Sequence, residues 1–441
     1  MSAQPENRNP TLTRHDLAIA LAIALAVATF HFINGRALSN SVLLQSFNWL
    51  FDFDSSRFVG GWCTPGADVA RDMGVSFVAR HALSLATRPP CLALTALIGD
   101  PNVALMALTA LCAGVAAGIA YWLAAAFCEH AIDRTLLAIA FAVSAQPLLL
   151  GVIPETYGFA LAGIGLHLAL VAHGRAAPPA TGWSAVVSFG INAGVTVTNA
   201  GLNIISSMAL AWKRLTLNQW LRGQFRVWVI AAVVLAAIVV PLAALFTPTA
   251  LSAAGTAPKQ VWWIININRG EAAGLARVVT TFFAYDFVAP MLTVVNLPAP
   301  DSHPMLDFRT FGYGLAGSLA LAIWTLAMLA GVVYATGEDG ARRLLATVAL
   351  WMLANIVLHW YWQYRGSIYL YGAHTAFPLF AILAMGYGGA LRRHSHALVR
   401  GAAIALIVLS AVNNLQIYRQ MIDFVVAQPP QKQHEGPPIL N

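Results

Sequence analysis

Residues 17–33 read LAIALAIALAVATFHFI, an apolar run that contains no Asp, Glu, Lys or Arg. A helix needs about 20 predominantly apolar residues, within a range of roughly 17–25, to cross the hydrocarbon core of a bilayer. A loose small-residue cleavage pattern follows at 37–39, so a secretory signal peptide is the alternative. The run is long for a signal core, and we expect an uncleaved first membrane helix with residues 1–16 in the cytoplasm.

The composition of the whole chain is also typical of a membrane protein. Of the 441 residues, 59% are hydrophobic and only 10% are charged, whereas soluble domains carry about 25% charged residues. This composition argues against a soluble domain, a disordered chain and a nucleic-acid binder. The formal net charge is +7, with basic residues clustered between apolar runs, so lipid headgroups and phosphates are the expected anionic partners.

The remaining apolar runs extend the first helix into a bundle. They lie near 82–99, 103–126, 135–151, 158–173, 184–212, 227–246, 311–335, 344–362, 371–390 and 401–418. Two long interruptions separate them, an outer loop at about 35–102 and a second at about 247–310. We predict an all-α polytopic membrane protein of about 11 transmembrane helices, with one transmembrane domain over 17–426, juxtamembrane helices in the first outer loop and a disordered tail over 427–441.

Two topologies fit this pattern. In the first, 82–99 spans the membrane and 184–212 is one long helix. In the second, 82–99 is juxtamembrane or re-entrant and 184–212 is a helix pair broken near 196–199. The second places Arg134 and Arg175 on the cytoplasmic side, whereas the loops that the first places there contain no Lys or Arg. The positive-inside rule therefore favours the second topology.

The first candidate functional residues follow the first helix, where residues 52–57 read DFDSSR. On an extended segment Asp52 and Asp54 point the same way, and on a helix they diverge. A carboxylate at the membrane boundary can act as a general base on an acceptor hydroxyl or bind a divalent cation. The alternative is an ordinary polar loop in which an Asp caps a helix.

A further acid, Glu155, lies between two apolar runs in Pro154-Glu155-Thr156-Tyr157. An acid at bilayer depth costs roughly 2.5–3.5 kcal/mol on insertion scales, so such a residue usually faces a functional cavity. The equally weighted alternative is a helix that starts at Pro154 and carries Glu155 as a cap in its first turn.

Basic residues gather in the same first outer loop. Arg binds phosphate through paired hydrogen bonds, and we expect Arg57, Arg80 and His81 to bind a phosphate or pyrophosphate headgroup. Arg71 and Arg88 belong to the same basic set, and interfacial snorkelling is the alternative for its members.

A last group of polar residues lies near the C-terminal helices. The aromatic density of residues 359–365, HWYWQYR, fits an aromatic belt at the membrane interface. That belt does not explain Arg365, His374 or the pair Asn413-Asn414.

Asn199 and Asn203 likewise need polar partners inside a bundle. We expect Asn199, Tyr371 and His374 to contact substrate.

The four cysteines have no spacing typical of a zinc site. Cys63 and Cys91 share the first outer loop. They are either two free thiols or, in an oxidising compartment, a disulfide.

These segments together resemble the GT-C superfamily of integral membrane glycosyltransferases, which includes oligosaccharyltransferases, protein O-mannosyltransferases and aminoarabinose transferases. DFDSSR resembles the acidic segment in the first outer loop of that family. Residues 80–100, RHALSLATRPPCLALTALIGD, resemble its Leu-rich helix in the same loop, and SAQPLLLGVIPETYGFALAG at 144–163 resembles the outer turn that carries its second acid. TVTNAGLN at 196–203 resembles its broken-helix turn, and YRGSIYLYGAHTAFPL at 364–379 resembles a later outer loop.

The resemblance implies a GT-C fold and a transferase that moves a sugar from a polyprenyl-phosphate-linked donor to an acceptor hydroxyl of a glycan, lipid or protein. The reaction would take place on the periplasmic side of a bacterial inner membrane. Asp54, with Asp52 as the alternative, would deprotonate the acceptor. Arg365 would join the basic set on the donor phosphate.

The sequence does not decide whether the protein binds a divalent cation or whether it is a transporter instead of a transferase. Asp52, Asp54 and Glu155 either converge on a divalent cation or act without one. Walker A, dinucleotide-binding and G-x-S-x-G motifs are missing, which suits a lipid-carried donor better than a cytosolic nucleotide-sugar. The main alternative is a multi-pass transporter or lipid flippase, although no pair of corresponding hydrophobic halves is visible.

Overall fold

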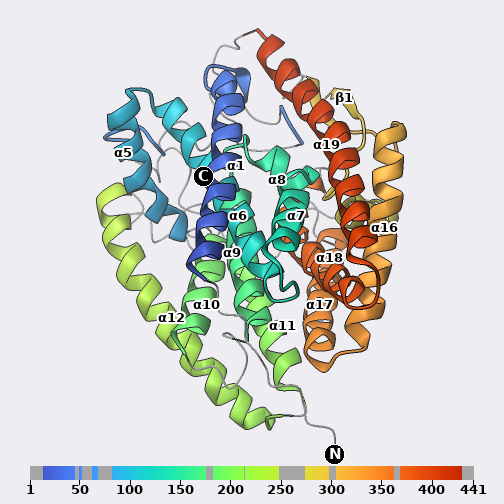
Figure 1. The fold of residues 1–441 in the computed structure, drawn as a ribbon. Coiled ribbons are helices and arrows are strands. Elements are labelled where there is room, and N and C mark those ends of the chain that lie inside the picture. The colour runs from blue at the N-terminus through green and yellow to red at the C-terminus, as the bar shows by residue number, and fades with distance from the viewer. Residues whose placement is uncertain are drawn as a thin grey trace, which may run out of the picture.

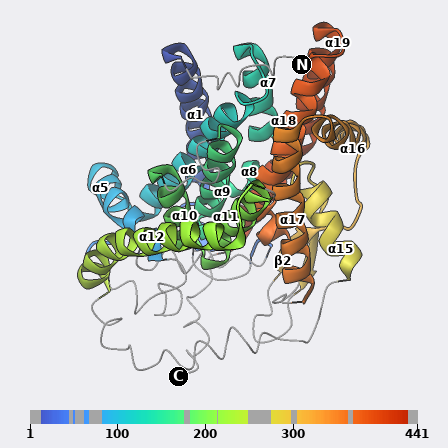
Figure 2. The ribbon, with the colours of Figure 1, turned by 90° about the horizontal axis from the view of Figure 1, so that it is seen from below.

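The computed structural model describes residues 13–44, 49–51, 62–67, 82–174, 182–212, 214–247, 274–296, 304–361 and 368–429. Helices dominate these residues, and their arrangement can be followed in Figures 1 and 2. Up to residue 246 the elements are α1 (Arg14–Gly35), η1 (Arg36–Leu38), η2 (Val42–Leu44), η3 (Ala82–Thr87), α5 (Arg88–Ile98), α6 (Pro101–Ala124), α7 (Ala131–Ala142), α8 (Ala145–Leu150), α9 (Thr156–Ala172), α10 (Trp183–Val195), η4 (Val197–Asn199), α11 (Ala200–Ala211) and α12 (Leu217–Phe246).

The later elements are α15 (Leu275–Thr280), the π-helical turn η6 (Thr281–Tyr285), β1 (Leu292–Asn296), β2 (Pro304–Phe308), α16 (Leu315–Thr336), α17 (Asp339–Tyr361), η7 (Tyr369–His374), α18 (Ala376–Leu391) and α19 (His396–Ala427). Figure 1 shows α12 along one edge of the bundle and α16 and α19 along the opposite edge.

The helical composition confirms the expected class of membrane protein. Among the described residues, six helices are long and apolar enough to cross a bilayer: α1 with η1, α6, α12, α16, α17 and α19. Shorter apolar helices, such as α9 and α18, pack between them. Strand is rare among the described residues, where β1 and β2 form one antiparallel pair within the predicted second outer loop.

The run 184–212 is broken, as the second topology predicts, and the alternative of one long helix is wrong. Thr196 leaves helical geometry with φ −152° and ψ 121°. Across the break, α10 and α11 contact each other. The Asn192 Nδ2 donates to the Asn203 Oδ1 at 2.8 Å, and the Asn203 Nδ2 donates to the Ser188 Oγ at 3.0 Å. Asn203 therefore finds the partners that its place inside a bundle requires.

The run 135–151, expected as one helix, is also interrupted. Helix α7 ends at Ala142 and α8 begins at Ala145. The first N–H groups of α8 have no acceptor within their own helix. They find acceptors in the second outer loop, where the Ala145 N–H donates to the Phe287 carbonyl at 3.0 Å and the Gln146 N–H to the Asp286 carbonyl at 2.9 Å. The break thus anchors that loop to the bundle.

Two ion pairs identify one end of the bundle. The Arg134 Nη1 lies 2.6 Å from the Asp16 Oδ1, and the Arg400 Nε lies 2.8 Å from the Asp133 Oδ1. The start of α1, the start of α7 and the turn between α18 and α19 therefore lie together. This agrees with the second topology, in which Arg134 shares the side of the N-terminus.

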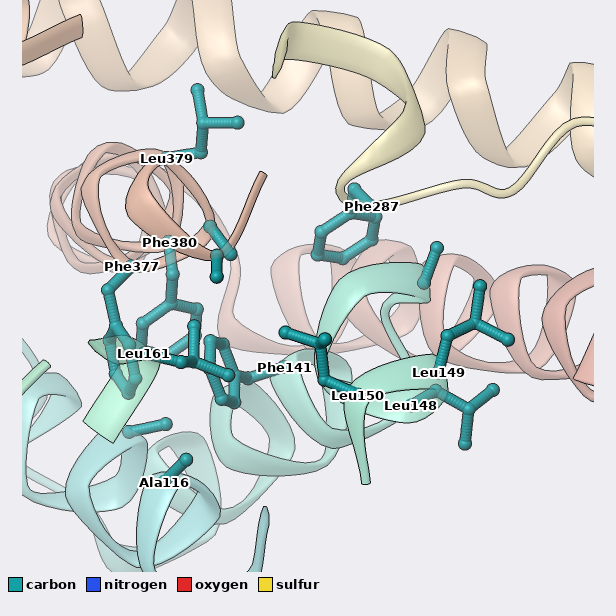
Figure 3. Close-up of a cluster of buried hydrophobic side chains, with 14 of the residues drawn as sticks. Ala116, Phe141, Leu148, Leu149, Leu150, Leu161, Phe287, Phe377, Leu379 and Phe380 are labelled. Atoms are coloured by element: carbon teal, nitrogen blue, oxygen red, sulfur yellow. The ribbon is translucent and has the colours of Figure 1, made fainter. Parts of the chain in front are cut away.

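A cluster of buried hydrophobic side chains packs α7, α9 and α18 together (Figure 3). The Phe141 ring of α7 lies 4.3 Å from the Phe377 ring and 5.1 Å from the Phe380 ring of α18, measured between centroids. Gly165 of α9 lets Phe377 approach, because an added Cβ would lie 2.4 Å from its ring. The cluster thereby fixes α9 against α18 and the loop that precedes α18.

Candidate functional site

The second outer loop enters the bundle as a non-helical turn held by the paired asparagines. The Asn414 Nδ2 donates to the Phe287 carbonyl at 2.8 Å, and its Oδ1 accepts from the Ala289 N–H at 2.9 Å. The Asn413 Nδ2 donates to the Ala289 carbonyl at 2.7 Å. Irregular backbone among membrane helices is tolerated only where protein or water satisfies it. The Asn413-Asn414 pair of α19 therefore positions this turn.

The turn carries a buried acid, Asp286, which is 2% exposed. Its Oδ2 accepts a hydrogen bond from the Thr375 hydroxyl. Its Oδ1 and the Oε1 of Gln146 have no hydrogen-bond partner among the described residues. Gly372 allows this approach, because an added Cβ would lie 2.1 Å from the Asp286 Oδ1. A buried carboxyl costs free energy unless its oxygens are satisfied, which makes Asp286 a candidate functional residue.

A polar pocket lies beside this turn. The residues that line it come from α15, η6, the end of β2 and η7: Arg277, Thr281, Tyr285, Asp307, Phe308, Thr310, Ile368 and Tyr369. The Arg277 Nη2 lies 3.0 Å from the Asp307 Oδ2, and the Phe308 N–H donates to the Asp307 Oδ1 at 2.8 Å. Burial raises the pKa of Asp307, although the Phe308 N–H and the Arg277 guanidinium oppose this shift.

The first outer loop reaches the same place. The Phe51 N–H donates to the Leu306 carbonyl at 2.9 Å, which extends the hairpin with a short parallel bridge. The Phe51 ring lies 4.6 Å from the Phe308 ring and 5.0 Å from the Tyr369 ring, between centroids. Phe51 has φ +49°, a left-handed conformation that is strained for a bulky residue and clusters at functional sites. It immediately precedes Asp52 in the sequence.

Several predicted site residues lie outside the described residues: Asp52, Asp54, Arg57, Arg80, His81 and Arg365. Their roles as general base and as donor-phosphate ligands stay predictions.

The three residues expected to contact substrate lie in one cluster. The His374 Nδ1 and the Asn199 Oδ1 are 2.6 Å apart. The Tyr157 ring lies 5.9 Å from both the Tyr371 ring and the His374 ring. The His359 ring stacks on Tyr371 at 3.9 Å. The break after α10 and the loop before α18 therefore bring together residues 175 positions apart.

Glu155 takes the capping role that was one of its two interpretations. It is the N-cap of α9, and its Oε2 accepts from the Thr156 N–H at 3.0 Å. It also lines a largely apolar pocket with Trp62, Leu105, Leu108, Thr109, Cys112, Pro154, Gly158 and Phe159. Glu155 therefore caps α9 and also lines a pocket.

The described part of the first outer loop is cross-linked. Cys63 and Cys91 form a disulfide with 5.2 Å between their Cα atoms. The alternative of interfacial snorkelling does not hold for Arg88, because Arg88 is 1% exposed and its Nη2 donates to the Ala67 carbonyl at 2.7 Å. Arg88 therefore holds the backbone of residues 62–67 instead of reaching the lipid interface.

A metal site finds no support among the described residues, where no group of three or more His, Cys, Asp or Glu side chains could hold a metal ion. With Asp52 and Asp54 outside that part of the chain, a divalent cation stays a prediction.

Sequence patterns did not single out Arg277, Asp286 or Asp307. They lie in the mixed segment 247–310, which has no clear periodicity. The available signal was an acid among aromatic residues in FFAYDFVAP at 282–290.

No family model matches the chain, and no curated protein matches its sequence.

Proposed function

We propose that this protein is a membrane glycosyltransferase that moves a sugar from a polyprenyl-phosphate-linked donor to an acceptor hydroxyl. One observation carries the proposal. Segments far apart in the sequence, at 49–51, 277–296, 304–310 and 368–375, meet around the buried carboxyls of Asp286 and Asp307. A lipid-carried donor would reach such a site from the membrane without a nucleotide-binding domain.

The reaction requires a base and stabilisation of the leaving group. Asp54, or Asp52 in its place, takes the proton of the acceptor hydroxyl as its oxygen bonds to the anomeric carbon. The bond from that carbon to the phosphate oxygen breaks, and the phosphate keeps the electron pair. Arg57, Arg80, His81 and Arg365 then stabilise the departing polyprenyl phosphate.

In this proposal Asn199, Tyr371 and His374 contact the donor sugar or the acceptor. The chain then has about 11 spans, and the site faces the periplasm of a bacterial inner membrane. The Cys63–Cys91 disulfide supports an oxidising compartment on that side.

A transporter or lipid flippase is the second candidate, and one observation favours it. Helices α9, α10 and α11 share a buried polar network in which the two His167 ring nitrogens each lie 2.6 Å from a hydroxyl, of Ser188 and of Ser206. Polar residues at broken helices line the transport path in many transporters.

The test is release of polyprenyl phosphate by purified protein supplied with polyprenyl-phosphate sugars and membrane-extracted acceptors. Asp54→Asn should abolish release, and Asp339→Asn is a matched control because Asp339 is exposed at the opposite end. Full activity of Asp54→Asn would overturn the base assignment. Movement of lipid across vesicles without release of polyprenyl phosphate would favour the flippase.

A further inference from the structure

The side chains of Asp286 and Gln146 meet at Gly372. A Cβ added to Gly372 would overlap the Asp286 Oδ1 and lie 3.1 Å from the Gln146 Cδ. The backbones of the two residues are also joined, because the Gln146 N–H donates to the Asp286 carbonyl at 2.9 Å. The Asp286 Oδ1 and the Gln146 Oε1 are buried and have no hydrogen-bond partner among the described residues. Two neighbouring acceptors therefore lack a donor.

The orientation of the Gln146 amide follows from its other contact. Its Nε2 donates to the Tyr369 carbonyl at 3.0 Å. A carbonyl oxygen only accepts, so turning the amide over would leave that carbonyl facing the amide oxygen. The Oε1 is therefore the end of the amide that remains for Asp286. The missing donor has to come from the carboxyl itself or from a species bound between the two residues.

The environment of Asp286 disfavours its charged form. The residue is 2% exposed, and an isolated buried carboxylate is costly enough that such a group normally takes up a proton. Burial raises the pKa of Asp286 well above its usual range, and the hydrogen bond from Thr375 opposes this shift only in part.

The elements around Asp286 supply no counter-charge. Among the described residues, the ionisable side chains on α15, η6 and η7 are Arg277, Tyr285, Tyr369, Tyr371 and His374. Arg277 pairs with Asp307 at 3.0 Å. The His374 Nδ1 contacts the Asn199 Oδ1, and tyrosines are neutral near pH 7. Helix α8 carries no ionisable residue, and α16 and α19 meet this turn through a tryptophan and two asparagines.

We propose that Asp286 is a neutral carboxylic acid that donates the proton on its Oδ1 to the Gln146 Oε1, and that this pair is a proton-dependent clamp on η7. One proton then satisfies both unpartnered oxygens and removes the charge. The Oδ2 keeps its hydrogen bond from the Thr375 hydroxyl, and Thr375 directly follows η7. Gln146 holds the first residue of η7 through the Tyr369 carbonyl.

The clamp bears on the proposed function because η7 carries Tyr371 and His374, which are expected to contact substrate. Loss of the proton would place a carboxylate against the Gln146 oxygen, and their repulsion would displace the ends of η7. Asp286 is then a positioning residue of the proposed transferase, and in this respect the inference rests on the proposed function. The protonation state itself does not depend on it.

Infrared spectra of the detergent-purified full chain test the proton directly. A protonated carboxyl has a carbonyl stretching band that a carboxylate lacks. The wild-type spectrum minus that of Asp286→Asn, recorded near neutral pH, should contain this band. Asp339→Asn is the matched control, because Asp339 is exposed and should contribute no such band. Absence of the band from the Asp286 difference spectrum would overturn the inference, and an ionised Asp286 bridged to Gln146 by water or a cation would give that result.

The pH dependence of thermal unfolding gives a second readout. The unfolded chain loses the Asp286 proton near the ordinary pKa of an aspartate, whereas the folded protein retains it, so this residue makes wild-type stability fall as pH rises above that value. In Asp286→Asn the Nδ2 donates to Gln146 as the acid does, and it does not titrate. The unfolding temperature of the wild type minus that of Asp286→Asn should therefore fall between about pH 5 and about pH 8. A constant difference would overturn the inference.

The proposed transfer tests the positioning role and separates the two proposals. The wild-type rate should fall as pH rises through the ionisation of Asp286, and this alkaline fall should move to higher pH in Asp286→Asn. Transfer with the same pH profile in both proteins would overturn the positioning role. A wild type that shows the infrared band and the pH-dependent difference in unfolding, but no transfer, would overturn the proposed function and leave the proton clamp in place.

Discussion

Arg134 and Asp16 form an ion pair across 118 positions of the chain, with 2.6 Å between the Arg134 Nη1 and the Asp16 Oδ1 and with both side chains less than a tenth exposed. Tyr121 donates to the same Asp16 oxygen at 2.9 Å. The neighbouring Asp133 pairs with Arg400. Two consecutive residues of α7 thus hold the first and the last described helices, at the end away from the candidate site.

Breaking this pair should destabilise the protein strongly. Asp16→Asn leaves the Arg134 guanidinium buried without a counter-charge, and removing one partner of a buried pair costs about 3–5 kcal/mol. Thermal unfolding in detergent measures the effect. Arg342→Gln is the control, because its pair with Asp339 is exposed and should contribute less than about 1 kcal/mol. Equal shifts for the two variants would contradict a structural role of the buried pair.

Gly372 should not tolerate a side chain. In Gly372→Ala the added Cβ would meet the Asp286 Oδ1 at 2.1 Å, so the loop before α18 must move. Overpacking of this kind costs about 1–3 kcal/mol, and the shift should also displace Thr375 from Asp286. The unfolding temperature and the proposed glycosyl transfer both report on this displacement. Gly401→Ala, which meets nothing within 4 Å, should leave both unchanged. Wild-type activity in Gly372→Ala would show that the position of Asp286 is not needed.

The sequence predicted the helices because membrane insertion depends on local hydropathy. The break at 196–199 was predictable for the same reason, since polar residues interrupt an apolar run there. The pairing of α10 with α11 and the placement of Asn199 against His374 depend on contacts 11 and 175 positions apart, and hydropathy does not encode such contacts.

Asp286 was not predictable as a site residue from the sequence. Its importance arises from burial and from Thr375, which is 89 positions away. The irregular segment around Asp286 can be buried because other residues satisfy its backbone groups. These are the Asn413-Asn414 pair, the N-terminus of α8 and the Trp324 indole. The sequence does show two adjacent asparagines, Asn413 and Asn414, in an apolar run, which indicates that they need polar partners. It does not show which segment supplies those partners.

The disulfide should be detectable by counting thiols. In protein that is denatured without reductant, Cys112 and Cys128 should react with a maleimide, and reduction should add Cys63 and Cys91. Cys63→Ser should lower the free energy of unfolding by about 2–4 kcal/mol, because the cross-link constrains the unfolded chain. Cys128→Ala removes a free thiol and leaves the cross-link in place, so it should keep one reactive thiol in the unreduced protein. Four reactive thiols in the unreduced wild type would contradict the cross-link.

Replacing Asn414 should destabilise the protein more than replacing any other asparagine that the structure describes. Asn414→Ala removes partners from three backbone groups, the carbonyls of Val143 and Phe287 and the N–H of Ala289. A buried polar group left without a partner costs about 1–3 kcal/mol, so the total loss should exceed about 2 kcal/mol. Asn414→Asp keeps the acceptor for Ala289 and loses both donations, so it should also be impaired.

Thermal unfolding of the two Asn414 variants measures this loss, and an assay of the proposed glycosyl transfer below the unfolding temperature separates stability from site geometry. Asn34→Ala is the control, because the Asn34 side chain donates only to the Phe30 carbonyl within its own helix, in an exposed contact. It should change the free energy of unfolding by no more than about 0.5 kcal/mol. Because Asn414 holds the turn that carries Asp286, its variants should lose the proposed transfer even while folded. Folded Asn414→Ala protein with full transfer would show that this turn does not position the site.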